Sequence, residues 1–130
     1  MSEDRRRADR IPVGFYVRQM VDGEAHRCFT TNLSSRGIFV EQVLACMERR
    51  SRVVQIEVPL PGTNESLWTR GEVVYDRFEP LFHGTAIRFT GMANTHRRML
   101  NHWLRDARRD SEQIGPIRSG SVTIHRPIHA

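Results

Sequence analysis

The stretch FHGTAIRFTGMANTHRRMLNHWLRDARR, residues 82–109, contains the change of periodicity that decides the fold. Its first part, FHGTAIRF, has the character of a β-strand, and the apolar residues after it recur with the 3.6-residue period of an amphipathic helix. Asn94 or Thr95 can cap the start of this helix through a side-chain oxygen. Its apolar face consists of Met92, Met99, Leu100, Trp103, Leu104 and Ala107. We expect this face to pack on a sheet or across the mouth of a barrel.

The sequence before residue 82 divides into short strand-like segments with turn signals between them. Asp22-Gly23 is typical of a hairpin turn, and Pro59, Pro61 and Gly62 punctuate a later loop. The strand-like segments are IPVGFYVRQMV (11–21), residues 24–31, GIFVE (37–41), VVQIEVPL (53–60) and LWTRGEVVYD (67–76). The mixed segment 42–51 leaves room for a helical turn. With FHGTAIRF, this pattern predicts a mainly β fold: a six-stranded antiparallel β-barrel with a C-terminal α-helix.

Length and composition indicate a single cytoplasmic domain. The chain has 130 residues, of which 38% are hydrophobic and 27% charged, as in globular proteins. No apolar run approaches the roughly 20 residues that span a bilayer. The N-terminus is charged from Glu3 onward and lacks the apolar region of a signal peptide. We expect an arm over residues 1–10, a barrel with its helix over 11–110, and a flexible tail over 111–130.

Cysteine and histidine do not form an evident metal or catalytic motif. Cys28 and Cys46 are too far apart for a CxxC pair, and we expect two reduced thiols. His125 and His129 have helical spacing, but Pro127 separates them. No Ser/His/Asp or Cys/His arrangement and no phosphate-binding loop stands out. We therefore expect neither a metal site nor an enzyme.

The basic residues of this chain are all arginine. It has 20 arginines and no lysine, with a net charge of +5 and a pI near 10.5. Guanidinium groups bind phosphates and guanine edges in a bidentate way, which suits an anionic, planar ligand. A GC-rich gene also explains missing lysine. Non-specific nucleic-acid binding is disfavoured, because the basic positions are scattered and lack interleaved aromatic residues.

Two polar motifs lie close to the first two predicted strands. Arginines at positions 5, 6, 7 and 10 lead directly into the first strand, although an RxxxR match alone arises roughly three times by chance in such a chain. The segment TTNLSSRGIFV (30–40) places Asn32, Ser34 and Gly37 at the turn after the second strand, with Arg36 at the same rim. In an antiparallel hairpin these two points lie at the same end of the sheet.

The turn motif has both a binding and a structural interpretation. The amide of Asn32 can accept from and donate to a purine edge, and Ser34 offers a hydroxyl group. Gly37 permits a positive φ or the close approach of a ligand to the backbone. Alternatively, these residues form an Asx or ST turn that only closes a hairpin. The arginine arm next to the turn favours the binding interpretation.

These motifs and the strand pattern together resemble a PilZ domain, the bacterial receptor module for cyclic di-GMP. The resemblance lies in RRADR (6–10), in NLSSRG (32–37) with the following IFV, and in the later GEVVY and GTAIRF segments. The resemblance extends from Arg5 to about Arg109 and implies a six-stranded antiparallel barrel with a C-terminal helix. It implies that Arg6 and Arg10 bind guanine edges and phosphates, and that the neighbouring Arg5 and Arg7 contribute to this binding.

The resemblance also implies that Asn32, Ser34 and Gly37 hold a guanine and the backbone near it. Asparagine is a permitted variant of aspartate at position 32, and its neutral amide would bind the guanine edge less strongly. Tyr75 ends a strand where family members place a group near the ligand, although core or rim packing is an alternative role.

The implied function is a cyclic di-GMP effector whose arm becomes ordered on the ligand and relays the signal to an unidentified partner protein. Motility, exopolysaccharide production or another surface behaviour is the implied output. The alternative is a PilZ-like adaptor that has lost ligand binding and acts only by protein contacts. One cyclic di-GMP or a stacked pair are both compatible with the arm, and the oligomeric state stays open.

Overall fold

The computed structural model describes residues 10–43 and 49–114. Residues 1–9, 44–48 and 115–130 lie outside the described part. The predictions for Arg5, Arg6 and Arg7, for the thiol of Cys46 and for the histidines of the C-terminal segment therefore lie outside the described residues. The elements are β1 (Ile11–Val21), β2 (Glu24–Leu33), β3 (Gly37–Val43), β4 (Val53–Pro59), β5 (Ser66–Phe78), β6 (Phe82–Met92) and α2 (Asn94–Ile114).

The strands form a closed antiparallel barrel in the order β1-β2-β3-β6-β5-β4, which confirms the predicted fold class. Four of the pairings join strands that follow each other in the chain. The β3–β6 pairing brings distant strands together, and the β1–β4 pairing closes the barrel, with Arg18 opposite Glu57. Closure satisfies the backbone groups that an open sheet would leave at its edges.

Alternating side chains fill the barrel as the sequence predicts. In β4, Val54, Ile56 and Val58 are buried, while the residues between them are more exposed. The turn between β1 and β2 has positive φ angles at both Asp22 and Gly23, which matches the predicted hairpin turn.

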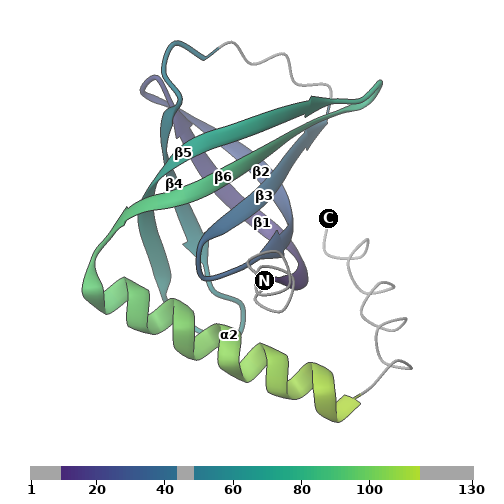
Figure 1. Ribbon diagram of the computed structural model, residues 1–130, viewed down its shortest axis with the longest axis vertical. Helices are drawn as coiled ribbons and strands as arrows, with labels where there is room; N and C mark the ends of the chain where they lie inside the picture. The colour runs from purple at the N-terminus through teal and green to yellow at the C-terminus, as the bar shows by residue number, and fades with distance from the viewer. Residues whose placement is uncertain (1–9, 44–48, 115–130) are drawn as a thin grey trace, which may run out of the picture.

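Helix α2 lies across one end of the barrel, and the β5–β6 hairpin extends beyond the other end (Figure 1). Leu100 and Leu104 of α2 are buried in the barrel core, and Met92, Met99, Trp103 and Ala107 pack around them. This packing confirms the predicted apolar face from Met99 to Ala107, whereas Met92, which was expected on the helix, is the last residue of β6. No helix in the described part of the chain is long and apolar enough to cross a membrane.

Several elements are longer than the sequence pattern indicates. Strand β2 continues to Leu33 and β3 to Val43, so the start of the mixed segment 42–51 is strand. Helix α2 continues to Ile114 and so passes the predicted boundary at residue 110. The sequence pattern does not reveal these extensions because polar residues lie near the ends of the elements, where the hydrogen-bonded backbone continues without the regular apolar spacing.

Candidate ligand-binding site at the β2–β3 loop

The start of β1 and the end of β2 meet, as the hairpin geometry predicts. Ile11 lies opposite Leu33 and Pro12 opposite Asn32. Arg10 directly precedes Ile11 and is exposed, whereas Leu33 is completely buried. The β1–β2 pairing therefore places Ile11, the first residue after the predicted arm, beside the NLSSRG segment.

The loop between β2 and β3 has a tight structure that depends on Ser34. The Ser34 amide donates to the Gly37 carbonyl at 2.9 Å, and the Ser34 hydroxyl oxygen accepts from the amides of Arg36 and Gly37, both at 3.1 Å. This is the ST turn that the sequence left open as an alternative. The Ser34 hydroxyl thus shapes the loop, whatever else it binds.

Gly37 is required for a reason that the sequence does not indicate. Positive φ angles in the described residues occur at Asp22, Gly23 and Gly62, and Gly37 is not among them. Instead, a Cβ atom on Gly37 would overlap the carbonyl oxygen of Ile87 in β6. Of the two roles suggested for Gly37, the positive φ is wrong, and the observed close approach to its backbone is that of the neighbouring strand.

A cavity of about 490 Å³ opens beside this loop. Six of the residues singled out in the sequence line it: Arg10, Asn32, Ser34, Arg36, Gly37 and Tyr75. Its volume lies in the range of small-molecule sites, and its walls combine apolar strand residues with a few polar groups. The fold therefore brings together every candidate site residue that lies in the described part of the chain.

Asn32 and Tyr75 each have groups available to a ligand in this cavity. Asn32 is half-buried, and within residues 10–43 and 49–114 its side-chain amide makes no hydrogen bond. The Tyr75 side chain is 51% exposed, and its ring lies 6.4 Å from that of Phe39 in a tilted arrangement. Tyr75 is thus not a core residue, and it offers an aromatic edge at the cavity rim.

The charge around the cavity is mostly positive. Arg10 and Arg36 are exposed at its border. Arg88 of β6 also lines it and forms an ion pair with Glu72, the residue opposite it on β5. These guanidinium groups can fork onto phosphate oxygens or onto the O6 and N7 edge of guanine.

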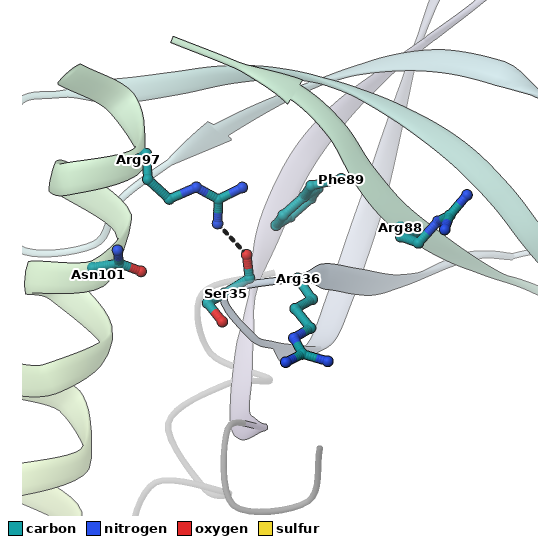
Figure 2. Close-up of a pocket in the computed structure, with 6 residues that line it drawn as sticks. All are labelled: Ser35, Arg36, Arg88, Phe89, Arg97 and Asn101. Carbon is teal, nitrogen blue, oxygen red and sulfur yellow. Dashed lines mark hydrogen bonds between the residues drawn. The ribbon is translucent and has the colours of Figure 1, made fainter. Parts of the chain in front are cut away.

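Sequence reasoning missed Arg88 and Arg97. Arg88 reaches the cavity only because β6 pairs with β3. Arg97 of α2 donates a hydrogen bond to the carbonyl oxygen of Ser35 in the loop (Figure 2). A signal for Arg97 existed, because it is a cation three and seven positions before Leu100 and Leu104, and so lies on the buried face of the helix.

The described residues hold no group of three or more His, Cys, Asp or Glu side chains that could bind a metal ion. Cys28 is a free thiol in the barrel core, and burial raises its pKa to about 12. A thiol of this kind is protonated at neutral pH and is a poor nucleophile or metal ligand.

Comparison with known proteins assigns the chain to a family. The family model described as the PilZ domain matches residues 4–106, and the chain therefore belongs to the PilZ family. PilZ domains form a receptor family for cyclic di-GMP and are not catalytic. The matched residues include both the arginine arm and the NLSSRG loop.

Two solved structures share this fold. The Bacillus subtilis inhibitor of motility MotI/DgrA matches with a TM-score of 0.67 and 14% identity, over 78% of this chain and 50% of that one. The Borreliella burgdorferi PlzA protein, solved in complex with c-di-GMP, matches with a TM-score of 0.50 and 6% identity, over 79% of this chain and 54% of that one. The chain thus spans about half the length of either protein. A search of curated proteins finds no match.

Proposed function

We propose that this protein binds cyclic di-GMP in the cavity beside the β2–β3 loop and acts as a signalling effector. The observation that carries the proposal is the pairing of Ile11 with Leu33, because it places Arg10 at the same cavity as Asn32 and Gly37. Membership of a cyclic di-GMP receptor family supports the same ligand.

The chemistry of the lining residues suits a guanine dinucleotide. Arg6 and Arg10 bind guanine edges or phosphates through paired N–H groups, with Arg5 and Arg7 beside them. The free amide of Asn32 can accept from the guanine N1 and N2 donors. Arg36 and Tyr75 contribute a cation and an aromatic ring at the cavity rim.

The proposed switch is the ordering of the N-terminal arm, residues 1–10, on the bound ligand. Its arginines wrap the two phosphates onto the barrel and change the surface that an effector protein meets. The ligand shifts this equilibrium only as far as it prefers the ordered arm. Control of motility or of exopolysaccharide production is the proposed output.

Calorimetric titration tests the proposal. Cyclic di-GMP should bind the wild type saturably, and Arg10→Ala should weaken binding at least about tenfold through loss of a charge-assisted hydrogen bond. Arg70→Ala is a matched control, because it removes the same charge from an exposed position that lines neither cavity of the loop region. Cyclic di-AMP should bind far more weakly, because adenine lacks the O6 acceptor.

The same titration gives the stoichiometry and distinguishes one bound nucleotide from a stacked pair. Trypsin cleavage within residues 5–10 should slow at saturating ligand if the arm becomes ordered. No heat with the wild type would refute the receptor proposal and leave the adaptor that acts through protein contacts alone.

A further inference from the structure

The side chain of Arg97 connects helix α2 to the candidate site. The Arg97 guanidinium donates a hydrogen bond to the main-chain carbonyl of Ser35, a residue 62 positions earlier in the chain. Ser35 lies between Ser34 and Arg36, both of which line the ligand cavity. Figure 2 shows Arg97 reaching from the helix to the loop, whereas the side chain of Arg36 does not point toward Arg97.

The position of Arg97 is fixed from the helix side. It lies in the first turn of α2, where its amide donates to the carbonyl of Ala93 at 2.9 Å. Leu100 follows on the same face and is completely buried. Further along, the Trp103 indole N–H donates to the Pro61 carbonyl at 2.9 Å, so α2 is attached to the barrel at several points.

The loop also has contacts within itself and with β6, and a cavity lies between it and α2. Besides its internal ST turn, the loop is held on one side by β6, where the Phe89 amide donates to the Arg36 carbonyl at 2.7 Å. On the other side a cavity of about 420 Å³ separates it from α2 and is lined by Arg97 and Asn101. The hydrogen bond from Arg97 therefore reaches the loop from the side that faces this cavity.

We propose that Arg97 is a positioning residue for ligand binding. It fixes the Ser35 peptide, and through it the conformation in which the loop presents the backbone around Ser34 and Gly37 to the nucleotide. The inference rests on the proposed function, since the loop is positioned for that ligand. By linkage, a nucleotide that selects this loop conformation also stabilises the attachment of α2.

The variants Arg97→Ala, Arg97→Lys and Arg98→Ala test this role. Arg98 is the matched control, because it is an exposed arginine of the same helical turn and its loss changes the net charge equally. Lysine keeps the charge and can donate a hydrogen bond to the carbonyl, but it lacks the planar fork of arginine. The exchange rates of the Ser34 and Phe89 amide hydrogens report on the loop without ligand, and the amide of Val58, in the core, verifies that each variant is folded.

We expect Arg97→Ala to exchange these two amides several-fold faster than Arg98→Ala and to bind cyclic di-GMP about tenfold more weakly. Arg97→Lys should recover part of both losses. The affinity loss should persist in 0.5 M NaCl, because positioning does not depend on charge attraction, whereas a direct contact with phosphate is screened by salt.

Two results would overturn the inference. The first is equal affinity and equal exchange in Arg97→Ala and Arg98→Ala. The second is an affinity loss that disappears in high salt with unchanged amide exchange, which would make Arg97 a direct ligand contact. If the wild type does not bind the nucleotide, the proposed function fails, and the exchange rates alone decide whether Arg97 holds the loop.

Discussion

The backbone of Gly37 lies directly against the carbonyl oxygen of Ile87, and a Cβ atom at position 37 would overlap that oxygen. This contact is between neighbouring strands, β3 and β6, at the point where the loop of the candidate site ends. It fixes the loop relative to β6, which contributes Arg88 to the ligand cavity. A single glycine thus supports both the closure of the barrel and the shape of the site.

Gly37→Ala should therefore destabilise the fold by about 2 kcal/mol, because the obstacle is backbone that cannot rotate away. Gly91→Ala is the matched control in the same sheet, where the nearest atom to a new Cβ is the Arg70 Cβ at an ordinary 3.4 Å. The free energy of unfolding in urea measures both variants. Equal stability of the two would show that the strands separate easily at Gly37.

Ser34→Ala should lower stability by about 1 kcal/mol and weaken cyclic di-GMP binding, because the amides of Arg36 and Gly37 lose the oxygen that accepts their hydrogen bonds. Ser34→Thr keeps the hydroxyl and should retain most of both properties. Urea unfolding measures the stability of the wild type and the two variants, and calorimetry measures their affinity for cyclic di-GMP. An alanine variant as stable as the threonine variant would contradict a structural role for the hydroxyl.

Asp76 is the centre of a polar network away from the ligand cavity. Arg49 forms a bidentate pair with its carboxylate at 2.9 and 3.0 Å, and His83 and Thr85 contact the same carboxylate at 2.8 and 3.1 Å. The hydrogen bonds from Arg49, and to a lesser extent from His83, hold the pKa of Asp76 far below its usual range despite partial burial.

A lowered pKa in the folded state means that ionised Asp76 stabilises the fold, and that this stability is lost progressively as the pH falls from about 5, through the unfolded-state pKa of about 3.9, toward the lower folded-state pKa. Asp76→Asn should cost roughly 3 kcal/mol at pH 7, because Arg49 loses its partner. The difference from the wild type should shrink by roughly 1 kcal/mol at pH 3. Urea unfolding at both pH values measures it, and a constant difference would rule out this ionisation.

Cys28 should be inert in the folded protein. Burial raises the pKa of its thiol to about 12, and the thiolate is the reactive form. In a Cys46→Ser background at pH 8, iodoacetamide should label the folded chain at least about a hundredfold more slowly than the urea-unfolded chain. Mass spectrometry follows the labelling, and comparable rates would place Cys28 in contact with solvent.

The parts of the site that sequence could predict are those joined by local structure. Arg10 and Asn32 belong to one hairpin with an Asp-Gly turn, so the alternation of the strands is enough to bring them to the same end. The apolar face of α2 follows from its periodicity in the same way.

The remaining features depend on pairings between distant segments. Arg88 reaches the cavity through the β3–β6 pairing, and the reason for Gly37 lies in Ile87 of the same pairing. Arg97 contacts Ser35 only once α2 has docked on the barrel. Local patterns contain no information on the order of strands around a closed barrel, and so these contacts required the structure.

Titration of the ¹⁵N-labelled protein with cyclic di-GMP, followed in two-dimensional NMR spectra, tests whether the nucleotide binds at the β2–β3 loop. We expect a saturable shift of the Gly37 amide signal, with little change at Gly23 in the β1–β2 turn or at Gly62 after β4. Saturable shifts at Gly23 or Gly62 with Gly37 unmoved, or no shift at any of the three, would contradict binding at this loop.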